Sequence, residues 1–99
     1  MRVMMKVSIP AEAGNKALRD GSLPKTMTAF MEDAKPEAAY FIAEGGNRTG
    51  IFFFDLKDPS SLPSASEQFF MNFNAAVEVT PAMNAEEMKA GVERAMKRL

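Results

Sequence analysis

The sequence predicts a single α+β domain spanning residues 1–99, in which a four-stranded antiparallel sheet carries its helices on one face. The first observation is a repeat, because the triplet Ser-Leu-Pro begins at Ser22 and again at Ser61. Each copy precedes an amphipathic run and then a short apolar segment. The second observation is the alternation of apolar and polar residues over 2–9, which is typical of a half-buried strand. Together they predict two similar β-α-β halves.

In the first half, the strand 2–9 ends at Pro10, and residues 11–19 predict a short helix weakened by Gly14. A longer helix is predicted from an N-cap at Ser22 to Lys35, because one apolar stripe runs along it and Pro36 disfavours helical geometry just before it. Residues 38–44 predict the second strand, and the glycine-rich residues 45–47 predict a hairpin turn.

In the second half, residues 49–56 predict the returning strand, and Ser60 or Ser61 is the predicted cap of the next helix. Residues 75–80 predict the fourth strand. A last helix is predicted after Asn84, with Glu87 three residues later at the spacing of a capping box. The apolar stripe of this helix comprises Met88, Val92, Ala95, Met96 and Leu99. The order βαββαβ followed by a helix predicts a ferredoxin-like fold with strand order 4-1-3-2.

Composition excludes several classes of function. The net charge of −1 provides no basic surface for nucleic acid or an anionic membrane. Cysteine and histidine are absent, which excludes disulfides, thiol chemistry and histidine metal sites, so we expect no metal and no cofactor. Lys6 interrupts the apolar N-terminus, and no segment approaches the ~20 apolar residues of a membrane span. A cytoplasmic protein is therefore expected.

Strand alternation assigns the two faces of the sheet different characters. One face is almost wholly apolar and is expected to take the helices. The second face is mixed: Met4, Lys6, Ser8, Tyr40, Ile42, Glu44, Ile51, Phe53, Asp55, Glu78 and Thr80. Contiguous apolar side chains on an exposed face mark an interaction site, so the second face predicts a homodimer.

The stretches "GNRTGIFFFDLKDPSSLP" and "FNAAVEVTPAMNAEEM" resemble a small uncharacterised bacterial family of the dimeric α+β barrel group. This group includes muconolactone isomerase, the cofactor-free antibiotic-biosynthesis monooxygenases and the stress-responsive barrel proteins. The resemblance spans most of the chain and implies two ferredoxin-like sheets closed face to face. The resemblance assigns no catalytic residue to this sequence.

Five polar residues of the mixed face are the candidate site: Lys6, Tyr40, Glu44, Asp55 and Glu78. The first interpretation is a structural ion-pair cluster with a tyrosine at the dimer interface. The alternative is catalysis, in which Tyr40 and Glu78 orient a carbonyl substrate and move a proton. We expect Lys6 to lie between Glu78 and Asp55, and the desolvated Glu78 to hold its proton unusually well. Arg48 is a further ligand-binding candidate at the cavity mouth, or simply a solvated residue.

The segment "RTGIFFFDL" invites comparison with the RNA-recognition motif, but its Phe52 and Phe54 fall on the helix-facing side and predict core. The sequence thus predicts a non-catalytic dimeric barrel that binds a small molecule or is purely structural. One alternative is a cofactor-free isomerase or monooxygenase acting on a small, partly apolar substrate in the barrel cavity. The other is a protein-interaction module.

Overall fold

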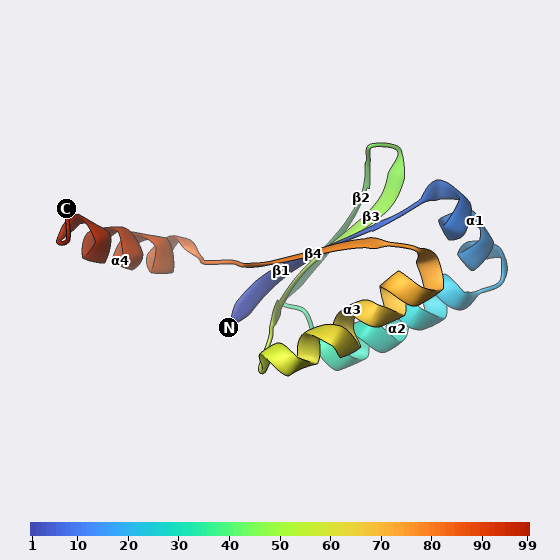
Figure 1. The fold of residues 1–99 in the computed structure, drawn as a ribbon, viewed down its shortest axis with the longest axis horizontal. Helices are drawn as coiled ribbons and strands as arrows, with labels where there is room; N and C mark the ends of the chain where they lie inside the picture. Colours follow the sequence, from blue (N-terminus) through green and yellow to red (C-terminus); the bar gives the residue numbers. More distant parts are fainter.

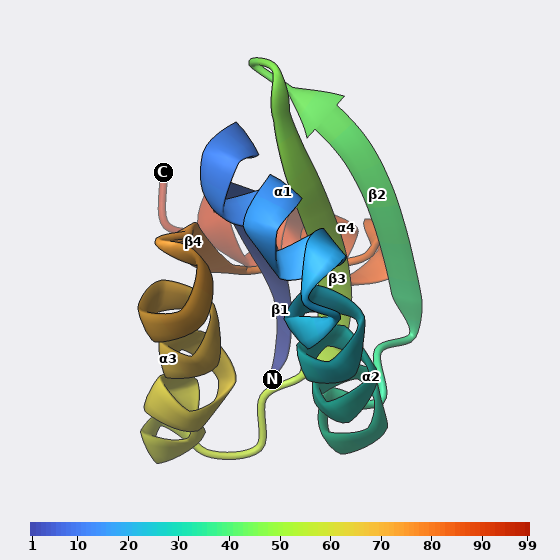
Figure 2. The same cartoon turned by 90° about the vertical axis from the view of Figure 1, so that its right-hand side faces the viewer.

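The computed structural model describes all 99 residues. Helices α1, α2 and α3 cover one face of a four-stranded sheet, and α4 stands apart from them (Figures 1 and 2). In chain order the elements are β1 (Arg2–Ile9), α1 (Ala11–Arg19), α2 (Ser22–Ala34), β2 (Ala38–Glu44), β3 (Asn47–Asp55), a 3₁₀ turn (Pro59–Ser61), α3 (Leu62–Phe73), β4 (Ala76–Pro81) and α4 (Ala85–Met96).

The strands are ordered β2-β3-β1-β4, and all neighbours are antiparallel. Counted from the opposite edge, this is 4-1-3-2. The Leu-Pro pairs of the two repeated triplets lie in the first turns of α2 and α3, which pack on the same face of the sheet (Figure 2). The arrangement is compatible with a ferredoxin-like fold.

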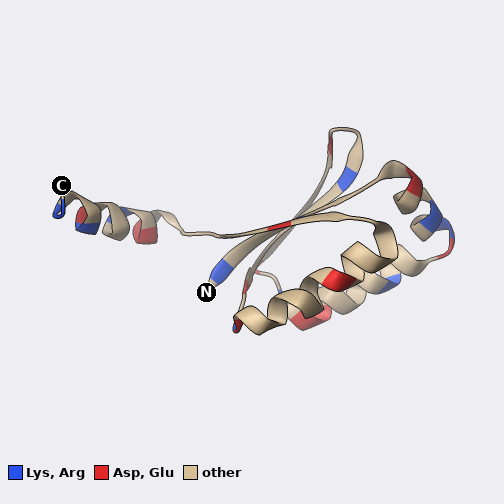
Figure 3. Cartoon of the chain, viewed as in Figure 1, with Lys and Arg blue, Asp and Glu red and all other residues tan.

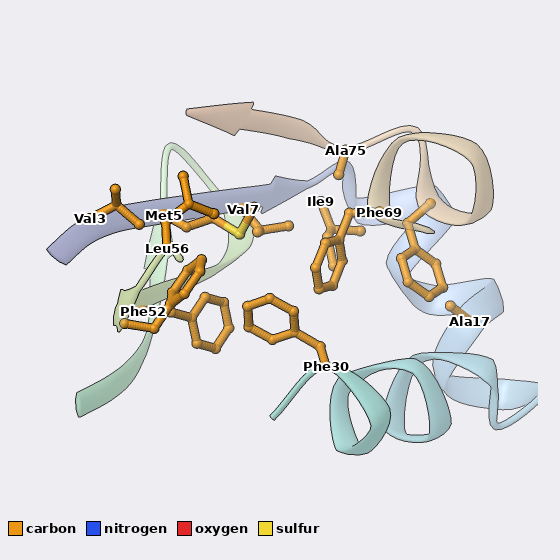
Figure 4. Close-up of a cluster of buried hydrophobic side chains, with 12 residues drawn as sticks. Val3, Met5, Val7, Ile9, Ala17, Phe30, Phe52, Leu56, Phe69 and Ala75 are labelled. Carbon is orange, nitrogen blue, oxygen red and sulfur yellow. The ribbon is translucent and has the colours of Figure 1, made fainter. Parts of the chain in front are cut away.

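The core lies between the sheet and the three helices. Along β1 every second residue is buried, as the alternation predicts, and Val3, Met5 and Val7 are almost fully enclosed. Phe30 of α2 is the centre of an aromatic cluster, since its ring lies edge-on 4.9 Å from Phe52 and 5.3 Å from Phe69 between ring centroids. Figure 4 shows these side chains converging from the sheet and the helices. The interpretation of the aromatic strand as core is confirmed, because Phe52 and Phe54 are both buried.

The local signals for turns and caps are partly confirmed. Gly45 and Gly46 both have positive φ, of 60° and 80°, which is the conformation that a two-residue hairpin turn requires. The N-cap prediction at Ser22 is wrong: Gly21 holds that position, and Ser22 is the first helical residue. The Asp20 carboxylate, two residues before Ser22, accepts a hydrogen bond from the Ser22 amide, so the side-chain acceptor at this helix start is Asp20 and not the Ser22 hydroxyl.

At the start of α3, Ser61 is the N-cap residue, but its side chain makes no capping hydrogen bond. The Asp58 carboxylate instead accepts from the Ser60 amide and caps the preceding 3₁₀ turn. Two strand boundaries also differ slightly from the prediction. The third strand begins at Asn47, directly after the glycine pair, and the fourth spans Ala76–Pro81.

Helix α4 begins with the predicted capping box. The Asn84 side chain accepts from the Glu87 amide, and the Glu87 carboxylate accepts from the Asn84 amide. None of the residues of α4 is buried, and the helix extends away from the sheet (Figure 1). The chain consequently has a radius of gyration of 15.9 Å, against about 13 Å for a compact domain of this length.

Candidate functional site

The sheet face opposite α1–α3 is open, and the register arranges its side chains in rows across the four strands. One row runs Tyr40, Ile51, Lys6, Glu78, because Ile51 pairs with both Tyr40 and Lys6, and Lys6 pairs with Glu78. The neighbouring row contains Ala38, Phe53, Met4 and Thr80. A charged centre thus lies among apolar side chains, as the sequence predicts for this face.

Lys6 forms the centre of the charged cluster. Its Nζ donates a hydrogen bond of 2.6 Å to Oε1 of Glu44 and lies 4.0 Å from Oε2 of Glu78. The hydrogen bond that Lys6 donates to Glu44 raises the pKa of Lys6 above its ordinary value. Glu44 pairs with Asn47 whereas Lys6 pairs with Ile51, so the lysine crosses β3 diagonally to reach the carboxylate. The lysine side chain is 25% exposed.

The prediction that Asp55 also contacts Lys6 is wrong. Asp55 pairs with Arg2, four residues along β1 from Lys6, and its carboxylate accepts from the N-terminal ammonium at 2.7 Å. A second cation, Lys57, lies 3.6 Å from the other carboxylate oxygen. The hydrogen bond from the N-terminus lowers the pKa of Asp55. Asp55 therefore lies on the predicted face, but its carboxylate binds the N-terminal ammonium and Lys57 and not Lys6.

The two catalytic candidates lie at opposite edges of the sheet. Tyr40 is on β2 and Glu78 is on β4, so three strand spacings of about 4.8 Å put them about 14 Å apart. This separation is too great for both side chains of one chain to act on the same atom of a small substrate. Glu78 also has a side chain that is 72% exposed, so the single chain does not supply the desolvation that we expected there.

Arg48 lies on the helix side of the sheet and not at the mixed face. Strand alternation places it with Gly50 and Phe52, and its Nη1 donates to the carbonyl oxygen of Ala11 in α1 at 3.5 Å. A Cβ atom on Gly14 would lie 2.8 Å from the same Nη1. The glycine that weakens α1 in the sequence therefore has a structural reason, because the guanidinium group packs against it.

Two concave regions lie on the opposite faces of this end of the sheet. A depression of about 290 Å³ on the open face is lined by Lys6, Ser8, Glu44, Gly45, Ala76 and Glu78. An apolar groove of about 200 Å³ on the helix side is lined by Val7, Ile9, Leu18, Leu23, Pro24, Met27, Phe41, Arg48 and Gly50. Three of the candidate residues, Lys6, Glu44 and Glu78, therefore share one depression, and Tyr40 lies outside it.

Sequence reasoning missed a second charged group on the open face. Arg2 donates from Nε to Glu37 at 2.8 Å and pairs through Nη1 with Glu87 of the α4 capping box. These contacts raise the pKa of Arg2, chiefly through the hydrogen bond to Glu87. The bond that the Asn84 amide donates lowers the pKa of Glu87, and Arg2 lowers it further. The only signal for this contact was an arginine at the start of a strand facing the mixed side.

The structure contains no group of three or more acidic side chains placed to hold a metal ion, and none of its helices combines the length and apolarity needed to cross a membrane. No protein-family model matches the chain, and no curated protein matches it significantly.

Proposed function

We propose that this protein is a non-catalytic, small-molecule-binding homodimer whose open sheet faces meet and enclose the depression around Lys6. One observation carries the proposal: a lysine held by two carboxylates lies in a face whose neighbouring side chains are apolar. Tyr40 and Ile42 on this face are largely exposed in the single chain. A second sheet would remove these apolar groups from water, and the depression would become an enclosed site.

The charges of the depression indicate the chemistry of the ligand. Two carboxylates, Glu44 and Glu78, surround one ammonium group, so the cluster carries an excess negative charge. Only Glu44 is directly hydrogen-bonded to the lysine, which leaves the Glu78 carboxylate free to accept. The preferred ligand is a small, partly apolar molecule with a hydroxyl or amine donor, and not an anion.

The experiment is native mass spectrometry of the freshly purified protein. We expect a dimer that carries additional mass from a co-purified small molecule. The Lys6→Met variant should lose this molecule, whereas Lys25→Met, which removes a lysine from the exposed surface of α2, should retain it. A monomer in light scattering at micromolar concentration contradicts the assembly. Equal ligand retention by the two variants contradicts the site.

A cofactor-free isomerase or monooxygenase remains the alternative function of the same cavity. Tyr40 and Glu78 are about 14 Å apart in one chain, so such an enzyme requires a site in which Tyr40 of one copy and Glu78 of the other contact the same substrate. Activity toward partly apolar carbonyl compounds that is lost in both Tyr40→Phe and Glu78→Gln would favour it.

A further inference from the structure

Helix α4 carries an apolar surface that nothing in its own chain covers. Its stripe comprises Met88, Val92, Ala95 and Met96; Leu99 follows the end of the helix, and the preceding connection adds Met83. The large members of this set are about half to nine-tenths exposed. An isolated helix of 12 residues is marginally stable in water, so α4 needs packing against an apolar partner to persist.

The exposed surface of the chain is too large for a monomer of its mass. A folded monomer of 10.9 kDa exposes about 5,600 Å² by the usual scaling of surface with mass. This chain exposes 6838 Å², an excess of about 1,200 Å² over that scaling. One partner in a standard protein interface buries about 800 Å². The excess is therefore larger than the surface that one partner of a standard dimer buries.

The direction of α4 is fixed by contacts at its beginning. The Ala82 amide donates to the carbonyl oxygen of Arg2 at 3.1 Å, and the Arg2 guanidinium binds Glu87 in the first turn. Beyond this anchor, α4 lies behind the sheet in Figure 2, on the side opposite α1–α3, and stands clear of it in Figure 1. In this position no residue of α4 is buried, so the open face of the same sheet leaves the apolar stripe uncovered.

We infer that the α4 stripe packs against a second copy of this chain. The inference rests on the proposed homodimer, because a copy whose sheet lies on the open face also comes within reach of α4. The charges of the helix fit a copy of this chain better than an anionic surface, since glutamates lie among its lysines and arginines (Figure 3). By two-fold symmetry each copy contributes one α4, so the two contacts are equivalent and the assembly closes at two chains.

Hydrogen–deuterium exchange of the full-length protein at low and high micromolar concentration tests the inference. The α4 amides should become protected only as the dimer forms, because the free helix opens readily. Concentration-independent protection would mean that α4 folds back on its own chain and would overturn the inference. Protection that appears only with anionic lipid vesicles would overturn it as well.

Matched substitutions locate the contact. Val92→Glu places a carboxylate in the stripe, and Ala90→Glu places the same group two residues away, about 200° around the helix. We expect Val92→Glu to raise the dimer dissociation constant at least about tenfold, and Ala90→Glu to leave it unchanged. Equal dissociation constants for the two variants would overturn the inference.

A third variant separates this inference from the proposed sheet interface. Ile42→Glu places a charge on the open face, far from α4 in the chain. If Ile42→Glu dissociates the dimer and Val92→Glu does not, the sheet interface stands and the α4 contact is overturned. If only Val92→Glu dissociates it, the α4 contact stands and the sheet interface fails.

Discussion

Gly50 offers a sharp test of how tightly the core is packed. It lies on β3 facing the helices, and a Cβ atom there would lie 2.7 Å from Cζ and 2.9 Å from Cε2 of Phe52. The Phe52 ring cannot move aside, since it is fully buried and lies edge-on to both Phe30 and Phe41. The obstacle is therefore space, as Gly50 is not among the glycines with positive φ.

Overpacking of this kind costs about 1–3 kcal/mol, and the loss of flexibility in the unfolded chain returns about 0.4–1 kcal/mol. We expect Gly50→Ala to lose about 1–2 kcal/mol of stability, and 1 kcal/mol lowers Tm by about 4–8 °C in a domain of this size. Thermal unfolding followed by circular dichroism at one fixed protein concentration measures the change. Gly91→Ala is the control, because nothing beyond its chain neighbours and its own helix backbone lies within 4 Å of its Cβ position.

A double-mutant cycle checks the cause. In a Phe52→Leu background the ring is absent, so Gly50→Ala should cost less there than in the native protein by at least about 0.5 kcal/mol. A Gly50→Ala protein as stable as the native one would refute the packing argument. Equal costs in the two backgrounds would show that the clash with Phe52 is not the cause.

Three further predictions concern charged groups. The single variant Lys6→Met should weaken the dimer more than the double variant Lys6→Met with Glu78→Gln, because the single change leaves the Glu78 carboxylate without its cation. Equal dissociation constants for the two variants in sedimentation would contradict this prediction. The N-terminal ammonium lowers the pKa of Asp55, so the contribution of this ion pair to stability is complete above about pH 4 and is lost as pH falls through the depressed pKa. Asp55→Asn should therefore be less stable than the native protein in urea at pH 7. A stability difference between the two proteins that fails to close below about pH 4 would argue against the pairing. Gly14→Ala gains about 0.8–1 kcal/mol of helix propensity but displaces the flexible Arg48 side chain, so it should stabilise the protein more in an Arg48→Ala background, and equal shifts in Tm would contradict that contact.

The parts of the fold that follow from local chemistry were predictable from the sequence. Alternation along 2–9 marked the buried face of β1, and the Asn84 capping box marked the start of α4. The paired Leu-Pro turns marked α2 and α3, since proline is tolerated in a first helical turn. The N-cap was wrongly placed at Ser22, because Gly21 is the residue at that position and the Asp20 carboxylate accepts from the Ser22 amide.

The candidate site was predictable in its face but not in its contacts. Alternation placed Lys6, Glu44 and Glu78 on one side of the sheet, and they do lie together. Which carboxylates reach the lysine depends on register and on the diagonal path of a long side chain, neither of which alternation specifies. Asp55 therefore shares the face but binds the N-terminus instead.

Sedimentation equilibrium of the native chain tests the central claim most directly, because the proposed sheet interface and the proposed α4 contact both need a second copy. We predict a mass twice the 10.9 kDa of one chain at micromolar concentration, reduced toward the monomer by either Ile42→Glu or Val92→Glu. A native protein that sediments at 10.9 kDa throughout the micromolar range would contradict the account.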